Sequence, residues 1–306
     1  MSTNPSSSGQ GLTRRRALGA ALLGGAAVAA PAVTGLSPAA AATTTGRRLP
    51  CPPVLPITLT PEGYSFPGPN PRPAGLVTLK VDTPDTAGRF MGLGATRNGI
   101  TFEQAMKLFW ESTSPDPNVA KPALVALYRD VEFFGGTGVF RDTSPLSVTL
   151  NLQPDTYYGI EGEHVQQLKV TEPYQHARPP RVDGVIRMVK RGGRSRFITP
   201  PVMKARGSYL VVNESAQPQE AVFCGVAPTT TDRTVQDYFD AVHNGQNPPN
   251  PLLTQVGGLM AMSPGRKAIL QFDFPKGRYS VLSFYRNPET ARKIAEEGMH
   301  RVIELR

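Results

Sequence analysis

The sequence predicts a mainly β protein of two Greek-key β-sandwich domains in tandem, each with one short helix, and three observations lead to the sandwich arrangement. Apolar and polar residues alternate over 146–153 and 267–274, which is the period of a half-buried strand. Turn residues are abundant, with 30 Gly and 31 Pro among 306 residues. The order of segments in one half also recurs in the other. Because each half-apolar sheet must bury one face, a pair of sheets is expected in each half.

The first 42 residues differ in composition from the rest of the chain. They contain three arginines at 14–16, an apolar run over 17–33 and four alanines at 39–42. A basic start, a short apolar core and a small-residue end are typical of a cleaved signal peptide. The arginines resemble a twin-arginine export signal. An uncleaved anchor is the alternative, but Pro31 interrupts the run, and no later stretch reaches the ~20 apolar residues of a spanning helix. We expect a secreted or cell-wall-associated protein.

The charge balance is mildly basic. The chain has 33 Lys and Arg against 24 Asp and Glu, a net charge of +9. Removing the leader with its three arginines leaves 30 basic residues and a net charge of +6. This charge favours anionic surfaces, but no basic stripe interleaved with aromatic residues predicts nucleic-acid binding. A cell-wall polymer, a small ligand or another secreted protein stays open as the partner.

The first domain is expected over residues 57–172, after a Pro- and Thr-rich lead-in at 43–56 that proline keeps extended. Thr101 and Gln104 fit a capping box, and the apolar spacing predicts a helix from Thr101 to about Ser112 with one apolar face. That face comprises Phe102, Ala105, Met106 and Phe109. Residues 122–134 combine helical and β patterns, and Gly135-Gly136 is expected to end this segment. The other expected strands lie at 57–60, 76–81, 90–93, 146–153, 157–160 and 164–170.

A linker is expected at 173–184, because prolines cluster there, and the second domain over 185–306. A hairpin over 185–199 has a basic tip, which is either an anion site or a solvated turn. The tip residues are Lys190, Arg191, Arg194 and Arg196. Later strands are expected at 209–213, 221–224 and 267–274. A turn at Pro275-Lys276-Gly277, another strand and a closing strand then follow.

The second half repeats the features of the first. A helix beginning at Thr234 has the same apolar spacing as the first helix, and Gly257-Gly258 matches Gly135-Gly136. Glu297-Gly298-Met299-His300 matches Glu161-Gly162-Glu163-His164, which would give His164 and His300 one repeat position.

A resemblance to a known family follows from a set of short motifs: Gly207, Val212-Asn213, the helix at Thr234, Gly257-Gly258, Pro264-Gly265, Gly277-Arg278-Tyr279 and Gly298-Met299. With these motifs the second half resembles the cupredoxin-like β-sandwich family, in the divergent form of twin-arginine-exported proteins of actinobacteria. The resemblance covers 185–306 well and 57–170 weakly. It implies a copper site of two His, one Cys and a weak Met. Near those positions stand Gln219, Ser283 and Met299, and Glu163 replaces the Met in the first half, so we expect copper-free domains.

Other chemistries lack their motifs. The four histidines are far apart and form none of the His-x-His pairs that copper oxidases need, and no Gly-x-Ser-x-Gly or His-Glu-x-x-His motif occurs. Gly92-x-Gly94 continues to Arg97 where a dinucleotide fingerprint requires glycine. Met260-x-Met262 is interpreted as core packing rather than a soft-metal site. Trp110, the only tryptophan, is either a ligand platform or a packing residue.

We therefore expect no catalytic residue and no cofactor, and a non-catalytic binding or surface-structural role. Its binding surface is expected between the halves or on the loops at one end of a sandwich. The alternatives are an extracellular enzyme of unrecognised type and a metal carrier that uses Met299 and His300. Cys51 and Cys224 either form a disulfide, as export would permit, or are separate buried thiols.

Overall fold

The first half of the molecule contains seven strands and two α-helices. The computed structural model describes residues 49–306, so the expected leader and the start of the lead-in lie outside the described residues. The elements are β1 (Val54–Thr58), β2 (Arg72–Asp82), β3 (Arg89–Thr96), α1 (Phe102–Ser112), α2 (Pro117–Asp130), β4 (Val131–Val139), the 3-10 helix η1 (Arg141–Thr143), β5 (Leu146–Leu152), β6 (Asp155–Glu161) and β7 (His164–Gln175).

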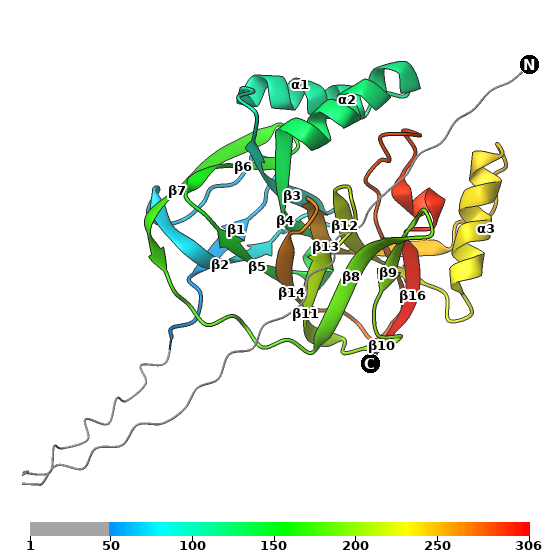
Figure 1. The fold of residues 1–306 in the computed structure, drawn as a ribbon. Helices are drawn as coiled ribbons and strands as arrows, with labels where there is room; N and C mark the ends of the chain where they lie inside the picture. The colour runs from blue at the N-terminus through cyan, green and yellow to red at the C-terminus, as the bar shows by residue number, and fades with distance from the viewer. Residues whose placement is uncertain (1–48) are drawn as a thin grey trace, which may run out of the picture. The chain divides into compact units, whose positions relative to one another are not determined.

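The second half repeats this order with one helix and two additional short strands. The elements are β8 (Gly184–Arg191), β9 (Arg194–Ile198), β10 (Val202–Met203), β11 (Arg206–Asn213), β12 (Gln219–Val226), α3 (Asp232–His243), β13 (Leu252–Met262), β14 (Lys267–Asp273), β15 (Gly277–Leu282), the 3-10 helix η2 (Ile294–Glu297) and β16 (His300–Leu305). Figure 1 shows α1 and α2 together at one part of the fold and α3 beside β16. Among the described residues, no helix has the length and apolar character needed to cross a membrane.

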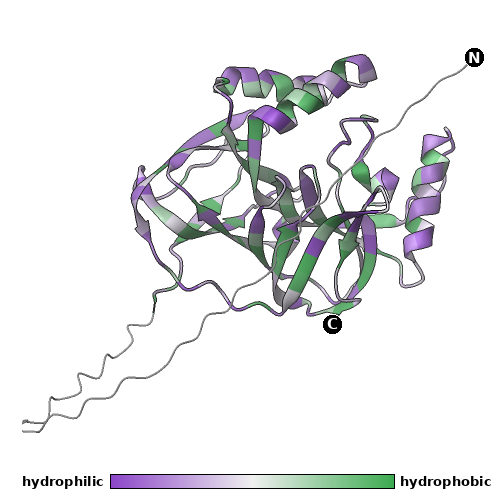
Figure 2. Ribbon diagram, viewed as in Figure 1, coloured by the Kyte–Doolittle hydropathy of each residue, from purple (hydrophilic) through white to green (hydrophobic). Residues whose placement is uncertain are grey.

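The strands form two layers that run through both halves. One layer has the order β10-β16-β15-β12-β13-β4-β3-β6-β7, and the other has the order β2-β5-β14-β11-β8-β9, with β1 beside β2. A parallel pair of β7 with β2 connects the two layers into one continuous sheet. A single apolar core lies between the layers and includes residues of both halves, such as Leu79, Leu93, Val148, Leu270 and Phe223. Figure 2 shows hydrophobic residues alternating with hydrophilic ones along strands and helices. The predicted mainly β fold is confirmed, and the two halves share this one core instead of burying a core each.

The two halves have matching strand pairings. In the first half β3 lies between β4 and β6, and β2 pairs with β5; in the second half β12 lies between β13 and β15, and β11 pairs with β14. Antiparallel pairs join the halves: Val148 of β5 faces Leu270 of β14, and Thr137 of β4 faces Leu259 of β13. Each joining pair thus places equivalent strands side by side around a pseudo-two-fold axis.

Several sequence predictions need correction. The first half has two helices instead of one, because α2 has its own cap at Asp116 and a proline at its first position. The helix α3 begins at Asp232 after the cap Thr231, whereas Thr234 is the third residue of its capping box. The glycine pairs lie inside β4 and β13 with positive φ and end neither strand. The strand β7 also continues to Gln175.

The proposed repeat match of the histidines is wrong by one residue. His164 faces Glu161 across the β6–β7 pair, whereas His300 faces Leu282 across the β15–β16 pair. Leu282 pairs with Val222 as Ile160 pairs with Gly92, so Leu282 is the equivalent of Ile160. The residue that faces Ile160 is Val165, which makes Val165 the counterpart of His300.

The two cysteines are separate thiols in the structure. Cys51 is exposed in the lead-in before β1, whereas Cys224 is buried on β12 beneath α3. Burial raises the pKa of the Cys224 thiol to about 12. A thiolate is the reactive form of cysteine, so the two thiols differ in both accessibility and reactivity.

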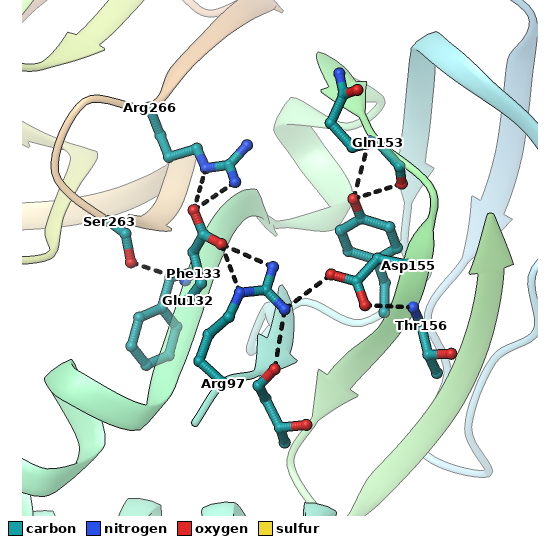
Figure 3. Close-up of polar contacts among 10 residues, drawn as sticks. Arg97, Glu132, Phe133, Gln153, Asp155, Thr156, Ser263 and Arg266 are labelled. Atoms are coloured by element: carbon teal, nitrogen blue, oxygen red, sulfur yellow. Dashed lines mark hydrogen bonds and ion pairs between the residues drawn. The ribbon is translucent and has the colours of Figure 1, made fainter. Parts of the chain in front are cut away.

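An ionic network links the two halves near one end of the strand pairs β4–β13 and β5–β14 (Figure 3). Glu132 of β4 accepts from Arg266 at 2.6 Å and from Arg97 at 2.7 Å, and Arg97 also pairs with Asp155 at 2.8 Å. The guanidinium of Arg266 lies 4.0 Å from the centre of the Phe134 ring, a cation–π contact. Glu132 therefore links one arginine from each half.

Replacement of Glu132 tests this network. Burial alone would raise the pKa of Glu132, but the contacts from Arg266 and Arg97 outweigh burial and lower it below the ordinary value of 4.5. A lowered pKa in the folded state contributes stability above the unfolded pKa that is lost as pH falls through the folded pKa. Glu132→Gln is expected to lower the free energy of unfolding by about 1 kcal/mol at neutral pH, because the pairs are partly exposed.

Chemical denaturation at pH 7 and at about pH 3 measures the effect, which should shrink at the lower pH. The matched control is Asp142→Asn, since Asp142 is 80% exposed in its pair with Arg141, and this change should alter stability little. An equal loss for Glu132→Gln at both pH values would contradict the ionic account.

Thiol reactivity tests the separation of the cysteines. In the native protein one thiol should react rapidly with a disulfide reagent, and both should react after unfolding. Cys51→Ser should remove the rapid reaction and leave the slow one, because only the buried Cys224 remains. A native protein with no reactive thiol until a reductant is added would instead show a disulfide.

Candidate functional site

The helices α1 and α2 form a hairpin over the outer face of the layer that contains β3, β4 and β6. Thr101 caps α1 through the predicted capping box with Gln104. Ala105 of α1 packs against Leu127 of α2 and Val131 of β4. The hairpin is therefore attached to the sheet through α2 and the start of β4, and the rest of α1 faces the sheet across a space.

The space between α1 and the sheet is an apolar cavity of about 350 Å³. Its lining comes from α1, α2, β3, β4, β6, β13 and the segment after β15, and it contains no charged side chain, histidine or cysteine. The predicted apolar face of α1, comprising Phe102, Ala105, Met106 and Phe109, lines the cavity. Small-molecule sites are usually concave, mostly apolar and of this size, with a few polar groups. We take this cavity, called the α1 pocket below, as the candidate site.

Two glycines of β3 explain why the pocket is open. Gly92 and Gly94 face the pocket, and a Cβ built on Gly92 meets no atom within 4 Å. Their equivalents in the second half are Val222 and Cys224. Gly92 and Gly94 of β3 stand between β4 and β6 as Val222 and Cys224 of β12 stand between β13 and β15. Val222 and Cys224 pack with Val235 and Phe239 of α3. The second half thus fills the space that the first half leaves empty.

Aromatic side chains stand around the α1 pocket. Phe102 of α1 stacks on Tyr158 of β6 with ring centres 4.3 Å apart. Trp110 lines the pocket and is 50% exposed, whereas Phe109 beside it is partly buried. The indole of Trp110 is therefore at the rim, in contact with both the pocket and solvent. This position agrees with the ligand-platform interpretation rather than with packing in the core.

A second cavity of about 370 Å³ adjoins the α1 pocket and shares Phe109, Thr113 and Tyr285 with it. It lies between the helix hairpin and the segment after β15, and Lys293 and Arg286 line it. Arg286 donates to the backbone oxygens of Ser112 and Ser114, which fixes this segment to the end of α1.

A buried carboxyl group stands close to the segment that carries Tyr285. Burial raises the pKa of Glu220 to about 7, against hydrogen bonds from the backbone N–H groups of Phe284 and Tyr285. Glu220 is therefore a weaker acid than an exposed glutamate.

Three residues that the sequence resemblance places at ligand positions, Gln219, Ser283 and Met299, lie near one another at one end of the second half. The backbone N–H of Ser283 donates to Met299 O at 3.2 Å, and the N–H of Glu220 donates to Ser283 Oγ at 3.1 Å. Gln219, Ser283 and Met299 are all fully buried. An amide, a hydroxyl and a thioether do not supply the imidazole and thiolate ligands of a copper site. These residues do not fit a copper ion.

The residues of the predicted metal-carrier alternative face different surroundings. Met299 lies in the core between the layers, whereas His300 contacts Gln236 at 3.0 Å and lies near Phe239 of α3. Among the described residues, no three His, Cys, Asp or Glu side chains gather as metal ligands would. Met260 lines the α1 pocket and Met262 lies in the core. The basic side chains of the β8–β9 hairpin tip are all exposed.

The α1 pocket is not among the binding surfaces expected from the sequence, although two signals point to it. Gly92-x-Gly94 does not complete a nucleotide motif, but two glycines at alternate positions also leave one face of a strand without side chains. The repeat is the second signal, since the second half has Val222 and Cys224 at the positions where the first half has Gly92 and Gly94. The expected binding surface was at the junction of the halves or the sandwich end, and the pocket instead lies mainly on the outer face of the first half.

Comparisons with known proteins found no matching family model and no similar sequence among the curated proteins. The chain is similar in structure to reduced auracyanin from Roseiflexus castenholzii, with 14% identity, a TM-score of 0.24, and coverage of 40% of this chain and 95% of that chain. It is similar to copper nitrite reductase from Nitrosomonas europaea, with 12% identity, a TM-score of 0.24, and coverage of 83% and 93%. A multicopper oxidase matches with 13% identity, a TM-score of 0.23, and coverage of 83% and 88%. These neighbours are cupredoxin-like proteins.

Proposed function

We propose that the chain is an exported, non-catalytic binding protein that holds a small apolar ligand in the α1 pocket. One observation supports this proposal above the others: the pocket of about 350 Å³ has an apolar lining and opens beside a half-exposed tryptophan. Apolar surface removed from water on binding contributes roughly 25 cal/mol per Å² before the costs of association. A ligand of matching shape therefore has a driving force without any charged contact.

The comparison of the two halves strengthens the proposal. Burying apolar side chains stabilises a fold, and a cavity that could be filled costs stability. The second half fills the equivalent space with Val222 and Cys224, whereas the first half leaves Gly92 and Gly94 there. The same scaffold can thus be closed, and the open form is the one that offers a binding site.

The enzyme alternative gains no support from this site. Acid–base and nucleophilic catalysis need carboxylates, imidazoles, thiols or amines within reach of a substrate. The lining of the α1 pocket has none of these groups and offers only hydroxyl groups and the indole N–H. A carrier role for metal ions is not proposed either, because Met299 and His300 face different surroundings.

Filling the pocket from Gly92 tests the proposed function. Among the described glycines, Gly92 alone combines an open Cβ position with a φ outside the left-handed region, so a larger side chain is accommodated without backbone strain. Gly92→Leu is expected to weaken binding of the uncharged dye Nile red by at least about tenfold, because the side chain occupies the space of the ligand. Dye fluorescence and quenching of Trp110, the only tryptophan, measure binding.

Gly92→Ala is the graded control and should weaken binding less, because one methyl group fills little of the cavity. Leu253→Ala is the control for non-specific apolar contact, since Leu253 is 65% exposed and remote from the lining. Thermal unfolding of each variant confirms that the fold is kept. Equal dye binding by the wild type and Gly92→Leu would refute the pocket as the site.

A further inference from the structure

The outer face of the second layer carries basic side chains where that layer ends at β9. Ile186 and Met188 of β8 lie in the core between the layers. Because side chains alternate along a strand, Arg187 and Arg191 of β8 lie on the outer face, and both are exposed. The strand β8 therefore presents two cations to solvent on the side away from the core.

The strand β9 adds two more cations to the same face. Residues that face each other in an antiparallel pair lie on one side of the sheet. Arg194 faces Arg191, and Arg196 faces Val189, which stands between Arg187 and Arg191 on the outer side of β8. Both arginines of β9 are exposed. Figure 1 shows β8 and β9 side by side.

A further cation comes from β14. Lys267 faces Val212 of β11, and Val212 faces Arg187 of β8. The three residues thus form one row across the outer face, and Lys267 is exposed. Lys190 of the hairpin tip lies outside this group, because alternation places its side chain on the other side of β8. The group, called the basic patch below, comprises Arg187, Arg191, Arg194, Arg196 and Lys267.

Glu214 is the carboxylate that pairs with the basic patch. It accepts from Arg187 Nε at 3.0 Å and from Arg187 Nη2 at 2.7 Å. The hydrogen bonds from Arg187, with smaller contributions from Lys267 and Arg191, lower the pKa of Glu214. Among the described residues, the other cations of the patch form no ion pair with a carboxylate. The patch therefore keeps an excess of positive charge.

The scaffold does not require this charge. Like charges that face each other destabilise a sheet, as Arg191 and Arg194 do here. Charged side chains on an edge strand can prevent pairing with other chains, which would account for Arg194 and Arg196. That role does not account for Arg187 and Lys267, because β8 and β14 lie inside the layer. In the first half β1 pairs with β2 as β8 pairs with β11, and β1 has no charged residue.

The dimensions of the basic patch favour an extended partner. Neighbouring strands lie about 4.8 Å apart, so the patch spans about 14 Å from β14 to β9. Along β8, about 13 Å separates Arg187 from Arg191. A compact anion reaches only neighbouring cations, whereas a polymer with repeated charges can contact all of them.

The residue types of the patch favour phosphate groups. All of its cations except Lys267 are arginines, and a planar guanidinium binds phosphate through two parallel hydrogen bonds. The outer faces of β8 and β9 carry no aromatic side chain on which a nucleic-acid base could stack. The patch lies on strands, and the amphipathic helix that enters a membrane surface is no part of it.

We infer that the basic patch binds a linear polymer with repeating phosphate groups, which lies on the outer face of the second layer across β14, β11, β8 and β9. The polymer supplies the counter-charge that the fold lacks there and reduces the repulsion between Arg191 and Arg194. The patch belongs to the second half, whereas the α1 pocket lies mainly on the first half. Binding at the patch therefore goes beyond the proposed function and does not depend on a ligand in the α1 pocket.

Titration with long-chain inorganic polyphosphate at several salt concentrations tests the inference. Each phosphate contact of a single-stranded nucleic acid contributes about 0.7 to the slope of log affinity against log salt, so the wild type should give a slope of magnitude about 3. Joint replacement of Arg191, Arg194 and Arg196 by Gln should weaken binding at least about tenfold and lower the slope to about 1. Lys267→Gln, on another strand, should lower the slope by about 0.7.

The matched control removes the same amount of charge outside the patch. Lys121, Lys169 and Lys276 are exposed, and their joint replacement by Gln should change the affinity less than about twofold, because salt screens distant charges. Thermal unfolding checks that both triple variants keep the fold. Equal losses in the two triple variants would show an effect of net charge alone and overturn the inference. An unchanged slope for Lys267→Gln would overturn it as well.

Two further probes separate the polymer from other anions. Orthophosphate at the same phosphate concentration should compete weakly with polyphosphate, and vesicles that contain anionic phospholipid should bind more weakly than polyphosphate. If orthophosphate competes fully, the site takes compact anions; if vesicles bind best and the patch variant loses them, it is a membrane site. Either result, or no binding of polyphosphate to the wild type, overturns the inference. Nile red binding tests the proposed function separately.

Discussion

The pairing of β4 with β13 and of β5 with β14 is the constraint on which the rest of the structure depends. Through these two contacts each layer continues from one half into the other, and one apolar core fills the space between the layers. The inner face of every strand is committed to that core. What differs between the halves must therefore lie on the outer faces, in the connections, or at the ends of the strands.

The ends of the strands, the outer faces and the helical connections differ between the halves. At the end of the second half stand Gln219, Ser283 and Met299, and continuing the strand pairings places Arg89 and Glu161 at the first two of these positions in the first half. Arg89 and Glu161 form an ion pair at 3.2 Å, with Glu161 buried. Neither arrangement is suited to redox chemistry. The outer face of the first half, in contrast, gains a longer helical connection and loses two side chains, and the α1 pocket results.

The parts of the fold that depend on local patterns could be predicted from the sequence. Alternation identified β5 and β14, and the capping residues Thr101 and Gln104 located the start of α1. Tertiary features were harder to predict. The strands β4 and β13 continue through glycine pairs because close strand crossings leave no room for a Cβ: one built on Gly136 would lie 2.1 Å from Met91 O. The network of Glu132, Arg97 and Arg266 joins residues far apart in the chain, and a cavity arises only when a helix and a strand face each other.

The pseudo-two-fold axis has a consequence for the origin of the molecule. Each half taken alone would present two open strand edges, and open edges of this kind pair readily with other chains. The edges are self-complementary about the axis, since Val148 faces its equivalent Leu270, so two identical copies of one half would satisfy them by forming an isologous dimer. In such a dimer both subunits have the same sequence, so a substitution changes both. When the two copies are fused into one polypeptide, each half can change separately, and a cavity can form in one half while the equivalent space in the other half stays filled.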